Sequence, residues 1–115
     1  AGHDGLVSAR GEHAAAIAAS GLHVDGGWGE GVAAVELVRS IPNETGDLLV
    51  LATKAHDSAA ALAPWSQHDG TPVLVLQNGL GGEQAVRDAL PHSPVAIGLA
   101  LFAVSLTAPG RITVT

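Results

Sequence analysis

Two short apolar runs, at residues 48–52 and 72–76, are the clearest feature of the hydrophobic pattern. Neither run alternates apolar with polar residues and both are too short for a buried helix, so each predicts a strand covered on both faces. Between them, residues 57–65 are rich in alanine and leucine, begin with Asp-Ser and contain Pro64, which predicts a crossover helix. This β-α-β pattern predicts an α/β domain with a mostly parallel, Rossmann-like sheet, whose ligands bind at the carboxyl ends of the strands.

The start of the chain predicts a second strand-helix unit. Residues 6–9 form a strand candidate that ends at Arg10, and residues 12–20 predict an alanine-rich helix that Gly21 ends at the C′ position. A brief strand is predicted at residues 22–24.

The remaining segments are less regular. Residues 25–31 are glycine-rich and predict a loop, whereas residues 33–40 fit either an edge strand or a helical turn. Residues 82–90 predict a helix, residues 95–105 one further buried strand, and residues 111–115 a last strand after a turn.

Composition narrows the classes of function. The chain has 115 residues, of which 47% are hydrophobic, enough for one small domain. A formal net charge of −6 without a cluster of Lys or Arg argues against a nucleic-acid or anionic-membrane surface. The sequence has no cysteine, which excludes disulfides and thiolate metal sites and is compatible with the cytoplasm. No apolar run approaches the roughly 20 residues of a transmembrane helix.

Three polar residues lie just after predicted strands: Arg10 follows directly, Lys54 follows Thr53, and Asn78 follows Gln77. Because the carboxyl ends of parallel strands form one rim, we expect these side chains at a shared ligand-binding edge. A cationic residue there can neutralise a ribose 2′-phosphate, so Arg10 and Lys54 favour NADP over NAD. The alternative for Arg10 and Lys54 is a solvated surface position, and for Asn78 it is a tight turn.

Other candidate motifs have simpler interpretations. Residues 29–34 match G-x-G-x-x-G/A, but only a brief strand precedes them and Glu30 would place a negative charge in the anion site. The six histidines show no paired spacing on one element, so we expect no metal site. The sequence His56-Asp57-Ser58 resembles a hydrolase triad only as text, because triad residues converge in space, and a helix N-cap at Asp57 or Ser58 is the better interpretation.

Five motifs occur in order along the chain: AGH at residues 1–3, ARGEH at 9–13, TKAHD at 53–57, QNGLG at 77–81 and APGRI at 108–112. This combination resembles the N-terminal domain of the ketopantoate reductases, or 2-dehydropantoate 2-reductases. The resemblance implies a Rossmann domain that binds NADPH, followed by a helical C-terminal domain. It also implies NADPH-dependent reduction of 2-dehydropantoate to pantoate, a step of pantothenate biosynthesis.

The resemblance implies roles for individual residues. Arg10 and Lys54 would bind the 2′-phosphate side of NADP, and Asn78 would be the catalytic residue, between nicotinamide and substrate. The backbone around Val104 would line the nicotinamide pocket. Relatives often have His at the position of Phe102, in a more polar stretch, so the substrate stays open between 2-dehydropantoate and another 2-keto acid.

The resemblance also predicts what lies outside this chain. The family's first strand, its glycine-rich loop and its first helix are expected before Ala1, and the C-terminal domain with its catalytic lysine after Thr115. We therefore expect residues 1–115 to be a partial dinucleotide-binding domain with weak cofactor binding and negligible turnover by itself. Without a central first strand, two apolar strand edges would be open. The alternative function is therefore a non-catalytic interaction module or homo-oligomer.

Overall fold

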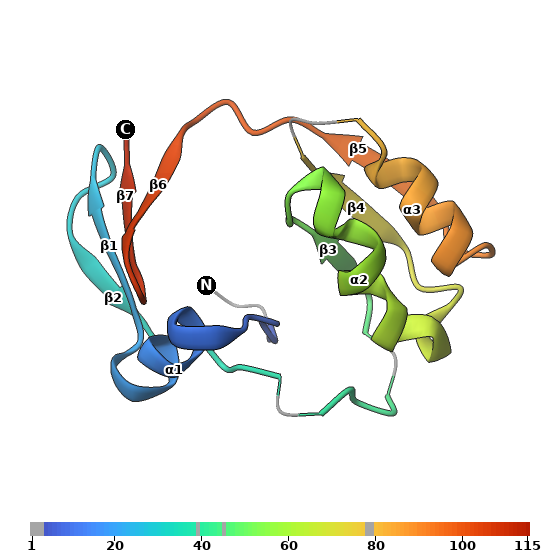
Figure 1. Ribbon diagram of the computed structural model, residues 1–115, viewed down its shortest axis with the longest axis horizontal. Helices are drawn as coiled ribbons and strands as arrows, with labels where there is room; N and C mark the ends of the chain where they lie inside the picture. The colour runs from blue at the N-terminus through green and yellow to red at the C-terminus, as the bar shows by residue number, and fades with distance from the viewer. Residues whose placement is uncertain (1–3, 39, 45, 78–79) are drawn as a thin grey trace. The chain divides into compact units, whose positions relative to one another are not determined.

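The computed structural model describes residues 4–38, 40–44, 46–77 and 80–115. The chain divides into two compact units: unit 1 comprises Ala1–Ser40 and Phe102–Thr115, and unit 2 comprises Ile41–Leu101. Each unit has its own β-sheet, with three parallel strands in unit 2 and four mixed strands in unit 1 (Figure 1). The predicted α/β class with a parallel sheet is confirmed.

Unit 2 is built on a sheet with the strand order β3-β4-β5. The strands are β3 (Leu49–Leu51), β4 (Val73–Leu76) and β5 (Val95–Gly98), all parallel. The two apolar runs at 48–52 and 72–76 contain β3 and β4, which pair directly with each other. The predicted β-α-β unit is therefore confirmed.

Helices connect these strands. They are η1 (Ala55–Asp57), α2 (Ser58–Leu62), η2 (Ala63–His68) and α3 (Gly82–Ala89). The crossover predicted as one helix at residues 57–65 is in fact divided, because the α-helix ends at Leu62 and continues as a 3-10 helix. Pro64 explains the division, since it has no N–H to donate to the carbonyl four residues earlier.

The core of unit 2 lies between the sheet and the helices α2 and α3, which cover the same face of the sheet (Figure 1). Six buried side chains form it: Leu51, Leu62, Val73, Val75, Val86 and Leu90. The expectation that both faces of the run 48–52 are covered is wrong, because Val50 alternates to the other face and is 53% exposed.

A buried histidine anchors the segment that precedes β3. His68 is 1% exposed, and its Nε2 donates a hydrogen bond of 2.7 Å to the carbonyl of Pro42. The ring of Trp65 lies 5.3 Å from the His68 ring. This contact holds the start of unit 2 against the end of its crossover.

Unit 1 contains a mixed sheet with the order β2-β1-β7-β6. Its strands are β1 (Leu22–Gly26), β2 (Gly31–Ala33), β6 (Val104–Ala108) and β7 (Arg111–Val114). β1 pairs parallel with β7 and antiparallel with β2, and β6 pairs antiparallel with β7. The segment predicted as a loop at residues 25–31 is thus the connection of the β1-β2 hairpin, and β1 extends into this segment as far as Gly26.

The helix predicted at residues 12–20 is confirmed as α1 (Gly11–Ser20), and the N–H of Gly21 ends it by donating to the carbonyl of Ile17. The strand predicted at residues 6–9 is only a single parallel bridge between Val7 and Leu37. At Leu37 this pairing favours the strand interpretation over a helical turn, although the described residues around it form a single bridge and not a continuous strand.

The single buried strand predicted at residues 95–105 is wrong. β5 ends at Gly98 in unit 2, whereas β6 begins at Val104 in unit 1 and is exposed along its whole length. Within unit 1 the ring of Phe102, just before β6, lies 4.7 Å from that of Trp28. An apolar run without alternation cannot distinguish one strand from two strands of different sheets.

Candidate functional site

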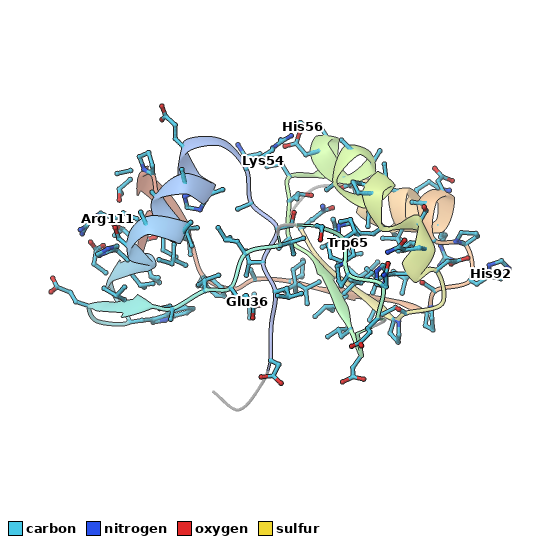
Figure 2. The ribbon with its side chains drawn as sticks, turned by 90° about the horizontal axis from the view of Figure 1, so that it is seen from below. Glu36, Lys54, His56, Trp65, His92 and Arg111 are labelled. Atoms are coloured by element: carbon cyan, nitrogen blue, oxygen red, sulfur yellow. The ribbon has the colours of Figure 1, made fainter. Side chains whose placement is uncertain are left out.

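The carboxyl ends of β3 and β4 form the candidate site, because these strands are adjacent and parallel. Lys54 follows β3 and is exposed, and its carbonyl accepts a hydrogen bond of 2.9 Å from the N–H of Asp57. Figure 2 shows Lys54 and His56 at one end of unit 2 and His92 at the other. Lys54 therefore lies on the rim that the sequence predicted. Asn78 lies outside the described residues.

A cluster of three polar side chains adjoins Lys54. The Nε2 of Gln77 donates to the Oγ of Ser58 at 2.7 Å and to the Oγ1 of Thr53 at 3.4 Å. Ser58 is fully buried at the start of α2, and Thr53 directly precedes Lys54. Sequence reasoning missed this cluster, although all three residues flank predicted strand ends or helix starts.

The expected helix cap is only partly correct. Asp57 occupies the N-cap position of α2 but makes no side-chain capping hydrogen bond, and the Ser58 hydroxyl accepts from Gln77 instead. His56 Nε2 lies 3.4 Å from the Oδ2 of Asp57, with the two side chains 75% and 37% exposed. Such an exposed pair contributes little to stability. Because Ser58 is buried, these three neighbours do not form an accessible nucleophilic site.

Gln77 also carries an unusual buried atom. Its Oε1 is buried and has no hydrogen-bond partner among the described residues. It lies over Gly82, the first residue of α3, where an added Cβ would approach Oε1 to 2.0 Å. The side chain of Gln77 therefore occupies space that only a glycine at position 82 leaves open.

The other predicted cofactor residues belong to unit 1. Arg10 is exposed at the N-cap position of α1, with extended backbone angles. Val104 begins β6, pairs with Val114 and is 43% exposed. Residues 29–34 enter β2 rather than a helix, so they offer no helix N-terminus to a phosphate.

One carboxyl group has a shifted pKa, at the end of unit 2 away from Lys54. A hydrogen bond from His92 to Asp69, with 2.6 Å between Nδ1 and Oδ2, lowers the pKa of Asp69 below its ordinary value of 3.8. In the described part of the chain, no three His, Cys, Asp or Glu side chains are grouped to hold a metal ion. No described helix is long and apolar enough to cross a membrane.

Comparison with protein families and known relatives covers the whole chain. The family described as ketopantoate reductase PanE/ApbA matches residues 1–115. A 2-dehydropantoate 2-reductase of Pyrococcus abyssi is 39% identical over 88 residues, which cover 75% of this chain and 29% of that protein. The chain spans about a third or less of the length of the curated relatives it matches.

Solved structures agree in fold. A ternary structure of D-mandelate dehydrogenase with NADH and anilino(oxo)acetate has a TM-score of 0.84 and 26% identity, covering 96% of this chain and 37% of that one. The 2-dehydropantoate 2-reductase of Geobacter metallireducens has a TM-score of 0.78 and 26% identity, covering 98% of this chain and 38% of that one. Both similarities extend over nearly all of the present chain.

Proposed function

This chain belongs to the ketopantoate reductase PanE/ApbA family, and from that membership we propose that it is part of the cofactor-binding domain of an NADPH-dependent reductase. The proposed substrate is 2-dehydropantoate, reduced to pantoate in pantothenate biosynthesis. The observation that carries the proposal is an exposed lysine, Lys54, at the carboxyl rim of two adjacent parallel strands, where such sheets bind ligands.

The residues of this rim suit a nicotinamide dinucleotide. The ammonium group of Lys54 can meet a phosphate, while the neighbouring Thr53 hydroxyl, which accepts a hydrogen bond from Gln77, can still donate one of its own. When bound, a reduced nicotinamide supplies the hydride for the keto carbon of the substrate. The part played by this chain is to bind and orient, because in our proposal the acid and the helical catalytic domain lie outside residues 1–115.

We assign four residues to this function. Arg10 and Lys54 bind the 2′-phosphate side of NADP through their positive charge. Asn78 orients substrate and nicotinamide with an amide that both donates and accepts hydrogen bonds. The backbone around Val104 lines the nicotinamide pocket. By itself the chain has weak cofactor affinity and negligible turnover.

The choice of NADP is the finer part of the proposal. The D-mandelate dehydrogenase was solved with NADH, so an NAD-dependent reductase of another 2-keto acid is the nearest alternative. Lys54 after β3 and Arg10 at the start of α1 are both cationic, which favours a phosphorylated ribose over the acidic residue of an NAD site. A direct comparison of NADPH with NADH therefore separates the two functions.

A chimera tests the activity. Residues 1–115 replace the matching segment of the Geobacter metallireducens 2-dehydropantoate 2-reductase, whose similarity covers 98% of this chain, and loss of NADPH absorbance is followed with 2-dehydropantoate as substrate. We expect turnover with NADPH and a lower kcat/KM with NADH. Lys54→Ala should raise the KM for NADPH about tenfold, as expected for a lost hydrogen bond to a charged group, and should leave that for NADH nearly unchanged.

The matched control is Lys54→Arg, which keeps the positive charge and should retain preference for NADPH. An unchanged KM for NADPH in Lys54→Ala would contradict the assignment of Lys54. Micromolar binding of NADPH to the 115-residue chain in isothermal titration would contradict the proposed weak affinity.

Association through strand edges is a second candidate function. β6 is terminal in the order of its sheet and is exposed along its length, and such edges can pair with another chain. Size-exclusion chromatography with light scattering tests it: a monomer at all concentrations would argue against this candidate.

A further inference from the structure

Gln77 connects the two ends of the segment that holds Lys54. The segment runs from Thr53, after β3, to Ser58, at the start of α2. One nitrogen of Gln77 donates to both end residues, at 3.4 Å to the Thr53 hydroxyl and at 2.7 Å to that of Ser58. Lys54 lies between them, and its carbonyl closes the turn with the N–H of Asp57.

The orientation of the Gln77 amide has a chemical reason. Its two N–H protons both find hydroxyl acceptors, which leaves one buried oxygen, Oε1, without a partner among the described residues. The reverse orientation would leave two buried N–H donors facing Gly82 instead. Leaving one acceptor unpaired costs less than leaving two donors unpaired, so the observed orientation is favoured.

A buried polar atom without a partner costs free energy, and a shorter or apolar residue at position 77 would avoid it. The surroundings nevertheless make room for the longer amide. At Gly82, a Cβ would approach Oε1 to 2.0 Å and the Cγ1 of Val75 to 2.9 Å. The amide is therefore held in place from both sides, by two hydroxyls and by the backbone of α3.

We propose that Gln77 is a positioning residue for Lys54, because its amide links Thr53 to Ser58 and so fixes the backbone on which the lysine is carried. This inference rests on the proposed function, in which Lys54 meets the 2′-phosphate of NADP. Gln77 itself does not contact the cofactor, since its polar atoms are either paired with the two hydroxyls or buried.

Hydrogen exchange on the 115-residue chain tests the positioning without a ligand. Gln77→Ala should accelerate exchange of the Asp57 amide about tenfold, because that N–H closes the turn at Lys54. The matched control is Gln84→Ala, which removes a glutamine on α3 that bonds only to Asp88 among the described contacts. Unchanged exchange in Gln77→Ala overturns the inference, as does equal acceleration in Gln84→Ala.

A double-mutant cycle on NADPH affinity tests whether Gln77 acts through Lys54. NMR titration should show affinity reduced about tenfold in Lys54→Ala and about fivefold in Gln77→Ala, with no further loss when the two are combined. A purely structural role of Gln77 would instead give additive losses and would overturn the inference.

Two further outcomes separate this inference from the function on which it rests. If Lys54→Ala binds NADPH like the wild type, the proposed role of Lys54 fails, and positioning by Gln77 fails with it. If Lys54→Ala is weakened but Gln77→Ala is not, only the positioning role is overturned. Should Gln77→Ala not fold, Thr53→Val decides, because it removes one of the two hydroxyl acceptors; we expect about threefold faster exchange at Asp57, and no change overturns the inference.

Discussion

Each of the two units of this chain is stabilised internally by a different kind of interaction. Unit 2 has a parallel sheet with helices on one face and six buried apolar side chains between them. In unit 1 the buried apolar side chains among the described residues are Ile17 and Val114, and the β6 strand is exposed throughout. Unit 1 relies more on backbone pairing, including the parallel register between β1 and β7.

This difference shows that similar strands can depend on different chemistry. Where helices supply side chains to cover a sheet, hydrophobic burial provides most of the stability. Where helices do not cover a sheet, the stability depends more on the close approach of neighbouring backbones and on single polar contacts. The units should therefore respond to different substitutions, which makes the contrast testable.

The largest effect is expected in the core of unit 2. Leu90 is fully buried, so Leu90→Ala should lower the free energy of unfolding by about 2–5 kcal/mol. Urea unfolding followed by circular dichroism measures this loss. The control is Leu80→Ala, since Leu80 is 97% exposed and its loss should change stability by less than about 0.5 kcal/mol. Equal effects would contradict the described core.

The next effect is expected where two backbones meet in unit 1. Gly26 has a φ of 96°, and an added Cβ would lie 2.1 Å from the carbonyl oxygen of Val114. Gly29 has a similar φ of 90° but open space around it. Gly29→Ala should lower the free energy of unfolding by about 1–2 kcal/mol because of its backbone angle alone. Gly26→Ala should lower it further, because its added Cβ also meets the Val114 carbonyl.

Amide hydrogen exchange in β7 distinguishes the effects of Gly26→Ala and Gly29→Ala. Gly26→Ala should expose the β1-β7 amides while leaving those of β4 protected. If amide exchange in β7 is the same in Gly29→Ala and Gly26→Ala, the close approach of Gly26 to the Val114 carbonyl does not determine the stability of unit 1.

A smaller effect is expected at a single hydrogen bond of unit 1. The N–H of Gly110, in the turn between β6 and β7, donates to the Nδ1 of His13 on α1 at 2.9 Å. His13→Ala should cost about 1 kcal/mol of unfolding free energy. His56→Ala serves as the control, because that side chain is 75% exposed, and thermal unfolding compares the two. A larger loss in His56→Ala would refute the assignment.

The smallest effect concerns pH and belongs to unit 2. His92 lowers the pKa of Asp69, so the carboxylate stabilises the fold above its ordinary pKa of 3.8, and this contribution is lost as the pH falls through the lowered value. His92→Ala should move the pKa of Asp69 back toward 3.8 in an NMR titration. His56→Ala should leave the pKa of Asp69 unchanged, and a shift in that variant would disprove the specific contact.

Sequence reasoning located the parallel unit well because its pattern is local. The apolar runs around Leu51 and Val75, with alanine-rich residues between them, identify two strands and a crossover without reference to distant residues. The prediction of one strand at residues 95–105 was wrong because the division there depends on distant residues. The apolar pattern of residues 95–105 continues across Gly98, whereas pairing with β4 ends there and pairing with β7 begins at Val104, and only tertiary contacts determine that division.

The candidate site shows the same limit. The rim position of Lys54 followed from the rule that parallel strands share a carboxyl edge. The contact of Gln77 with Ser58 did not, because it joins residues 19 positions apart through side chains whose directions no local pattern determines. Asn78 stays a prediction.

The placement of the two tryptophans gives each unit its own optical reporter. Trp28 in unit 1 is 66% exposed, whereas Trp65 in unit 2 packs against the buried ring of His68. Their fluorescence should therefore differ in emission wavelength, with Trp28 emitting further to the red. Replacing either indole by phenylalanine would leave a single emitter, so that melting of one half of the chain can be followed separately from melting of the other.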